Sequence, residues 1–325
     1  MSGPLQFNGL ERVVLPPGPV HVAVGMFDGV HLGHRAVIEA AVQSARRIGG
    51  RSVVLTFDPH PSVLFRPEDP VRLILSTEEK VRLIGALGVD AVVVQPFTRE
   101  FASVEADDFL PFLRRRLPGL AAVYVGENWR YGRGRLGDVA GLLEAGRREG
   151  VTVFSAPRVS LDGAVISSTR IRGAIAAGRI DEAGALLGYV YPTVGTVVTG
   201  RRLGRTIDFP TLNIDWNPDL RPRFGVYVVR VEAASGDLAA NLRPGDPRAY
   251  HPGVANYGVR PTVENTPVAR LEIHILGPCP YTYGDRLRVE WLRFLRPEEK
   301  FESLPALVAQ IGRDAAAARA QFSLP

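Results

Sequence analysis

Cysteine and long apolar runs are the features that this sequence most lacks. One cysteine, Cys279, stands in 325 residues, which excludes an internal disulfide framework and a zinc site built from several cysteines. No apolar stretch approaches the length of a membrane span, and the first residues lack the basic start and continuous apolar core of a signal peptide. We therefore expect a cytoplasmic protein that does not bind a membrane.

Blocks of like charge are also absent, although the formal net charge is +5 and arginine supplies most of the positive side. Such an excess suits RNA, nucleotides or a merely soluble surface. Without a basic tail, we do not expect a nucleic-acid partner. The balance of 46% hydrophobic and 22% charged residues is that of a folded protein, and the length predicts two domains. The sequence leaves the oligomeric state open.

The first half of the chain alternates short β-branched apolar runs with longer stretches of helical spacing. This rhythm predicts βαβ units and a parallel sheet. Ser76 and Glu79 have the spacing of a capping box and predict a helix start there. The five expected strands cover residues 20–26, 52–57, 91–97, 121–126 and 151–156.

The second half contains short strands with Gly and Pro between them, which predict a small β-barrel. An amphipathic helix over 303–322 closes the chain, and residues 235–252 are expected to form a long exposed loop. The predicted fold class is α/β, with a Rossmann-like domain over 1–188 and a barrel domain with a C-terminal helix over 189–325. The expected barrel strands cover residues 194–200, 224–231, 253–258, 271–276 and 286–295.

The stretch "GMFDGVHLGH", residues 25–34, lies between a predicted strand and a predicted helix. His31 and His34 are three residues apart in the first helical turn, so both imidazoles can face one ligand. Free amides at that helix end favour an anion, and Gly29 and Gly33 would allow a nucleotide to approach the backbone. A metal-binding pair, or a helix start that happens to hold two histidines, are the alternatives.

Three further polar clusters follow in the same half. Asp58 and His60 stand in "TFDPHP", and "VGENWRYG" combines Asn128 with Trp129 and Tyr131, a mixture that suits a flexible loop over a planar or phosphorylated ligand. The third cluster, "ISSTRIR", opens a helix with hydroxyl residues that suit a polyphosphate or simply cap the helix; its candidate residues are Ser167, Ser168, Thr169 and Arg172. A simple turn and a glycine-rich surface loop are the alternatives for the first two.

The second half offers a different set of candidates. Thr211 and Asn213 point the same way on an extended stretch after Pro210, where a hydroxyl and an amide could ligate a magnesium-bound phosphate or simply form a turn. Glu272 alternates with apolar residues in "LEIHIL", which suits either the solvent face of a sheet or a fixed general base.

These motifs, in this order, closely resemble the prokaryotic bifunctional riboflavin kinase/FMN adenylyltransferases, also called FAD synthetases. The resemblance implies that the N-terminal half joins FMN to the AMP part of ATP and releases pyrophosphate. The C-terminal half would phosphorylate riboflavin with ATP and Mg²⁺. It further implies catalytic roles for His31, His34 and Glu272, nucleotide or phosphate binding by Gly25, Phe27, Asp28, Gly29, Gly33, Ser168, Thr169 and Arg172, flavin binding by Asp58 and Asn128, and metal binding by Thr211 and Asn213.

The sequence departs from the family pattern at two points. Asp208 stands where the family usually has a glycine before Phe-Pro-Thr, and "GPCPYTYG" lacks an expected acidic residue. A carboxylate beside an ATP-binding turn could repel phosphate. This motivates one alternative, an adenylyltransferase with an impaired kinase. The basic composition motivates another, a regulatory protein that binds flavin or RNA.

Overall fold

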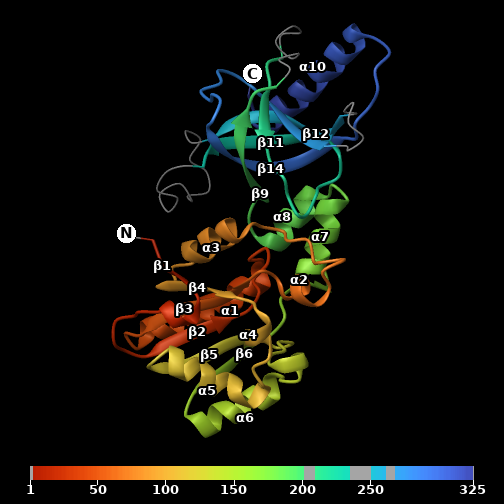
Figure 1. Cartoon of the computed structure of the whole chain (residues 1–325). Coiled ribbons are helices and arrows are strands. Elements are labelled where there is room, and N and C mark those ends of the chain that lie inside the picture. The colour runs from red at the N-terminus through yellow and green to blue at the C-terminus, as the bar shows by residue number, and fades with distance from the viewer. Residues whose placement is uncertain (1–2, 201–208, 235–249, 261–267, 325) are drawn as a thin grey trace. The chain divides into compact units, whose positions relative to one another are not determined.

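The computed structural model describes residues 3–200, 209–234, 250–260 and 268–324. The chain divides into two compact units, Met1–Ser168 and Thr169–Pro325. Each unit has its own sheet, a six-stranded open sheet in the first and a closed barrel in the second (Figure 1). Asp208 and residues 235–249 of the expected loop lie outside the described residues.

The first unit is built on a sheet in the order β1-β4-β3-β2-β5-β6, in which every neighbouring pair is parallel. The expected strands are all present, and the prediction of a parallel sheet is confirmed. The sequence did not predict β1, because its four residues form no apolar run. The strands are β1 (Leu5–Asn8), β2 (Val20–Val24), β3 (Arg51–Asp58), β4 (Ala91–Pro96), β5 (Leu120–Gly126) and β6 (Thr152–Ala156).

Helices connect these strands, as parallel pairing requires. Ser76 caps α3 by accepting a hydrogen bond from the Glu79 N–H at 3.3 Å, which confirms the predicted helix start. The helices of this unit are α1 (Leu32–Arg47), α2 (Pro61–Phe65), α3 (Thr77–Ala86), α4 (Arg99–Ala102), α5 (Ala106–Arg116) and α6 (Val139–Glu149), with 3-10 turns η1 (Leu10–Arg12) and η2 (Arg133–Arg135) and a small hairpin of β7 (Ser160–Leu161) and β8 (Ala164–Val165).

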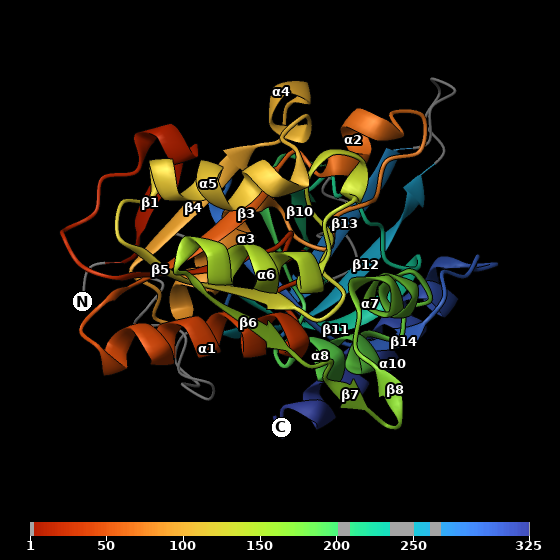
Figure 2. The ribbon, with the colours of Figure 1, turned by 90° about the horizontal axis from the view of Figure 1, so that it is seen from below.

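The central strands of the sheet in the first unit are buried on both faces. Val22 and Val24 of β2 pack in one core cluster with residues of α5 and α6, and these two helices lie side by side (Figure 2). Ala23, between them, points to the opposite face and is also fully buried. Helix α1 contacts the sheet outside that cluster. With both faces covered, the carboxyl ends of the strands are where ligand groups are expected to gather.

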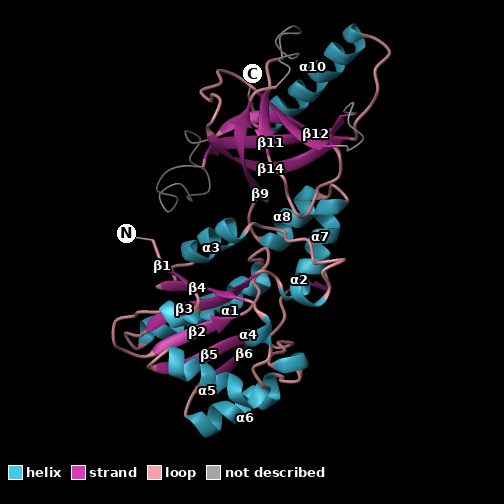
Figure 3. Cartoon of the chain, viewed as in Figure 1, coloured by secondary structure: helices cyan, strands magenta, loops and turns pink. Residues whose placement is uncertain are grey.

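The second unit is a closed barrel in the order β10-β13-β12-β11-β14-β9, so the predicted small barrel is confirmed. Helix α10 (Leu304–Gln321) runs beside it and contacts β12 (Figure 3). The other elements are α7 (Ser168–Ala176), α8 (Ile180–Leu187), β9 (Pro192–Val198), β10 (Leu212–Asp215), β11 (Gly225–Ala233), β12 (His251–Arg260), β13 (Val268–Ile275) and β14 (Arg286–Arg296).

The end of the expected exposed loop is a strand instead. His251 and Pro252 begin β12 and pair with Val231 and Arg230 of β11. A proline is tolerated at the start of a strand, and the neighbouring β11 provides the partner that the local sequence could not indicate.

Candidate active sites

The loop between β2 and α1 has unusual backbone angles. Phe27 and Val30 have φ of 49° and 38°, in the left-handed region, which costs a residue other than glycine about 1–3 kcal/mol. Both residues are buried, and Gly25 makes room for the Phe27 ring, because a Cβ at Gly25 would lie 2.9 Å from two ring atoms. Packing therefore holds this loop in a conformation that its sequence does not favour locally.

His31 and His34 meet at the start of α1. His31 is the N-cap, and its Nδ1 accepts a hydrogen bond from the backbone N–H of His34 at 3.3 Å. The two rings stack with centroids 3.6 Å apart, and the Phe27 ring meets His34 edge-on at 5.4 Å. A Cβ on Gly33 would lie 3.2 Å from His31 Cε1, so this glycine leaves space for the stack. The arrangement places two imidazoles at a helix end that favours anions.

Asp28 is buried in the same loop and braces it. Its Oδ1 accepts a hydrogen bond from the Ile74 backbone N–H at 3.0 Å, and its carbonyl oxygen accepts one from the Ser168 hydroxyl at 2.9 Å. The second contact joins the start of "ISSTRIR" to "GMFDGVHLGH". Thr169, which is exposed, and Arg172, which is half-buried, belong to α7 in the second unit.

Asp58 and His60 lie at the end of β3, next to β2. Because β2 and β3 are parallel neighbours, their carboxyl ends meet at one edge of the sheet, the edge that also carries the histidine pair. His60 caps α2: its Nδ1 accepts from the Ser62 N–H at 3.1 Å and lies 2.8 Å from the Ser62 hydroxyl. The structure thus gives His60 a local capping contact and leaves Asp58 at the strand end.

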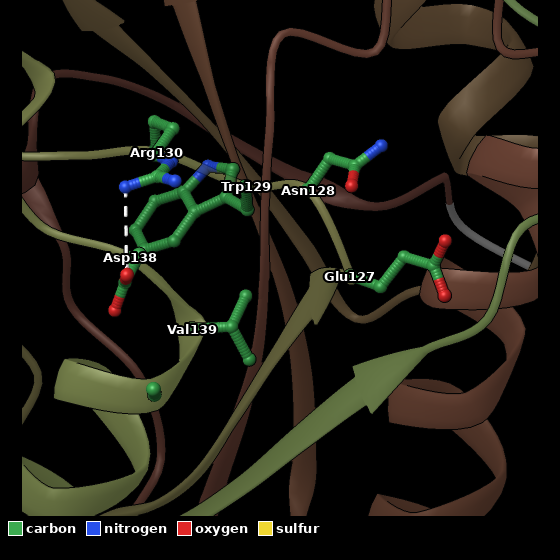
Figure 4. Close-up of a pocket in the computed structure, with 7 residues that line it drawn as sticks. Glu127, Asn128, Trp129, Arg130, Asp138 and Val139 are labelled. Carbon is green, nitrogen blue, oxygen red and sulfur yellow. Dashed lines mark hydrogen bonds and ion pairs between the residues drawn. The ribbon is translucent and has the colours of Figure 1, made fainter.

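Asn128 lies on the wall of a small open pocket of about 230 Å³ at the end of β5. The Asn128 and Glu127 side chains extend away from the Trp129 indole, and Arg130 pairs with Asp138 at 3.4 Å across the pocket (Figure 4). The pocket is lined by Glu127, Asn128, Trp129, Arg130, Asp138, Val139 and Ala140.

The rings of Trp129 and Tyr131 pack against the core, and Trp129 also lines the pocket. Their rings stack with centroids 4.7 Å apart, and both also contact Phe109 of α5. Tyr131 is buried and forms a β-bridge with Gly137, and a Cβ on Gly137 would touch the Tyr131 ring at 2.7 Å. The buried Tyr131 and the partly buried Trp129 anchor this loop to the core.

The candidates of the barrel meet on its outer face. Asn213 of β10 lies directly across from Glu272 of β13, and Glu272 lies across from Asn256 of β12. Cβ atoms at such positions are about 5 Å apart. Leu271 and Ile273, on either side of Glu272, point inward and are buried, so the predicted alternation of this strand is confirmed. Three adjacent strands therefore present an amide, a carboxylate and a second amide in one row.

Two contacts shape the surroundings of this row. A Cβ on Gly200 would collide with the Asn213 amide group, so the glycine leaves space for that side chain. The ring Nδ1 of His274 lies 2.9 Å from the Pro210 carbonyl oxygen, which ties the exposed Thr211 segment to β13. The side chains of Thr211, Asn213 and Glu272 all supply oxygen atoms, the ligands that Mg²⁺ prefers. Among the described residues, no group of three or more His, Cys, Asp or Glu side chains could hold a metal ion.

Comparison with known proteins identifies two family matches that together span most of the chain. Residues 16–170 match the FAD synthetase family, and residues 187–322 match the riboflavin kinase family. A protein from Listeria monocytogenes named bifunctional riboflavin kinase/FMN adenylyltransferase is 38% identical over 93% of this chain and 92% of its own length. The chain belongs to this bifunctional family. Relatives of the same name from Pseudomonas fluorescens and Escherichia coli K12 are 38% and 36% identical; they cover 91% and 93% of this chain and the same shares of their own.

A solved structure supports the fold across the family. A crystal structure described as a macrolide-efflux protein from Streptococcus pneumoniae superposes with a TM-score of 0.84 at 30% identity, covering 97% of this chain and 98% of its own. Its name refers to efflux, whereas the curated relatives are named for riboflavin and FMN; its likeness to this chain concerns the fold. In the part of the chain that the structure describes, no helix is sufficiently long and apolar to cross a membrane.

One member of the barrel row was missed by the sequence analysis. Asn256 lies opposite Glu272, and its Nδ2 donates to Glu298 Oε1 at 3.3 Å. The alternation in "GVANYG" indicated a strand, but only the pairing of β12 with β13 places this amide beside the carboxylate.

Proposed function

We propose that this chain makes FMN from riboflavin and then FAD from FMN, and that ATP is consumed in both reactions. Residues 1–188 would carry the adenylyltransferase and residues 189–325 the kinase. The observation that carries the proposal most directly is the placement of Asn213 and Glu272 at one register position, because a phosphoryl transfer to a hydroxyl needs a proton acceptor beside the group that holds the phosphates.

In the kinase reaction, the terminal ribityl hydroxyl oxygen of riboflavin attacks the γ-phosphorus of ATP, and the bond to the ADP oxygen breaks. Glu272 accepts the proton of that hydroxyl. Thr211 and Asn213 would hold Mg²⁺, which when bound neutralises charge on the ATP phosphates. The strand register places Glu272 beside Asn213, and a general base must lie within hydrogen-bond reach of the proton that it accepts.

In the adenylyltransferase reaction, a phosphate oxygen of FMN attacks the α-phosphorus of ATP, and pyrophosphate leaves. His31 and His34 would donate hydrogen bonds to the oxygens on which charge builds up. Ser168, Thr169 and Arg172 would bind the departing pyrophosphate, while Asp58 and Asn128 would contact the flavin. The stacked rings at the start of α1 support this assignment, because positioning and charge stabilisation carry most phosphoryl-transfer catalysis.

The direct test is a time course with purified protein, riboflavin, ATP and Mg²⁺, in which riboflavin, FMN and FAD are separated by chromatography. A parallel reaction starts from FMN. We expect FMN to appear first and then to be converted to FAD. If FAD formed only from supplied FMN, the impaired-kinase alternative, motivated by Asp208, would replace this proposal; the Asp208→Gly variant would then be expected to regain kinase turnover. The matches to both families over most of the chain do not favour that alternative or a regulatory RNA-binding role.

A further inference from the structure

A buried lysine joins the ends of two strands that lead into the first site. Lys80 of α3 is only 5% exposed. Its Nζ donates to the Phe57 carbonyl oxygen at 3.1 Å and to the Met26 carbonyl oxygen at 3.4 Å. Met26 lies in the loop between β2 and α1, which leads to the histidine pair. Phe57 is the neighbour of Asp58 on β3. One ammonium group therefore ties together the two motifs that were found separately in the sequence.

Burying the charge of this lysine has a cost in stability. Burial lowers the pKa of Lys80, although the carboxylates of Asp28 and Asp58 act in the opposite direction. A lowered lysine pKa means that the charged form is less favourable in the folded protein than in water. Below that pKa, the buried charge reduces the free energy of unfolding, because transferring an ammonium group out of water is costly. A neutral side chain of similar length would avoid this cost.

The composition of the chain points the same way. Of the 39 lysines and arginines, only two are lysines, Lys80 and Lys300. An arginine has a planar, bulky head group, whereas a lysine ends in a compact ammonium that donates in three directions. A compact donor is what two converging carbonyl groups require. Met26 is held a second time, since its carbonyl oxygen also accepts from the Thr56 hydroxyl at 2.9 Å.

We propose that Lys80 is a positioning residue of the adenylyltransferase reaction, which fixes the ends of β2 and β3 so that the histidine pair and Asp58 face one substrate. The inference rests on the proposed function of the first site. Lys80 acts through the backbone carbonyl groups of Met26 and Phe57, so its side chain is not required to contact a substrate. A second anchor on the same side, the Ile74 N–H to Asp28 hydrogen bond, leaves the α3 region attached when Lys80 is changed.

The test compares Lys80→Met with the wild-type protein and with Lys300→Met, which removes the other, exposed lysine. For Lys80→Met we expect kcat of FAD formation from FMN to fall at least about tenfold, because small displacements in a site have effects of this size or larger. KM should change less, riboflavin phosphorylation by the same preparation should be unchanged, and Tm should stay or rise. Lys300→Met should alter none of these, and Lys80→Arg should restore part of kcat.

Two results would overturn the inference: an unchanged kcat of FAD formation in Lys80→Met, or an equal loss of both activities with a lowered Tm. If Lys80→Met does not fold, Thr56→Val decides, since it removes the other donor to Met26. A loss confined to FAD formation supports the positioning role, and no loss in that variant contradicts it. The wild-type rate tests the proposed function separately, because a wild-type protein that forms no FAD contradicts that function whatever the variants do.

Discussion

Asn213 on β10 and Glu272 on β13 lie directly across from each other on the outer face of the barrel. The pairing holds an amide and a carboxylate on separate strands at a distance that the barrel hydrogen bonds determine. Neither residue depends on a loop for its place, which distinguishes this site from the loop-based site of the first unit.

Replacing Glu272 by Gln keeps the shape of the side chain and removes its ability to accept a proton. We expect FMN formation to fall by about 10²–10⁴-fold, the usual contribution of a general base, and FAD formation from supplied FMN to persist. Initial rates of both reactions check this. The exposed Glu302→Gln is the matched control, and normal FMN formation in Glu272→Gln would remove Glu272 from the proposed mechanism.

His31 has two separable roles, the helix cap and the imidazole. His31→Asn keeps a good N-cap residue, whereas His31→Ala loses the cap as well, at about 1 kcal/mol of stability. We expect both variants to lose FAD formation and to spare FMN formation, with a lower Tm for the alanine variant only. If His31→Asn retained FAD formation and only His31→Ala lost it, the helix cap would be needed and the imidazole would not.

Gly33→Ala should slow FAD formation without lowering the stability of the protein. An alanine at a helical position gains up to about 1 kcal/mol over glycine, but its Cβ would lie 3.2 Å from His31 Cε1 and displace the ring. We expect slower FAD formation with no loss of Tm. Gly312→Ala on α10 is the control, because nothing lies within 4 Å of its Cβ position. Equal effects of the two substitutions on FAD formation would contradict the steric argument.

We expect His21 to make the stability of the first unit sensitive to acid. Burial, and secondarily Arg47, lowers the pKa of His21; its Nδ1 lies 3.0 Å from the Tyr124 hydroxyl, and its Nε2 is buried without a hydrogen-bond partner among the described residues. As the pH falls below about 6.5, the unfolded chain binds a proton before the folded chain does, so the free energy of unfolding decreases until the folded-state pKa is reached.

The variant His21→Gln should remove this part of the pH dependence. Thermal unfolding of the wild-type protein and the variant, followed across the acid range, measures the difference between them. Parallel curves for the two proteins would show that His21 does not cause the loss.

The elements that the sequence predicted well are those with a local signal. Apolar runs marked the strands beside "GMFDGVHLGH", and simple alternation placed the Glu272 side chain on the outer face. The strand β1 gave no such signal and is fixed only by its pairing with β4.

The site contacts that the sequence missed are those between distant segments. Asn256 and Glu272 meet because β12 pairs with β13, and Lys80 reaches Met26 across the end of the sheet. The aromatic residues of the polar loop predicted a place near a ligand for Trp129 but not its ring contacts. Its contacts with Phe109 and Tyr131 come from the packing of α5 against that loop.

The closure of the barrel determines when each half can fold during synthesis. The first unit has all its sheet strands once Ala156 has left the ribosome. The barrel does not, because its first strand, β9, pairs with β14, the last one to be made, with Pro192 opposite Glu290. Contacts between such distant segments form slowly. Strand β9 must therefore wait with one edge unpaired until β14 arrives, and the nascent kinase half is the part of the chain most exposed to mispairing with another strand.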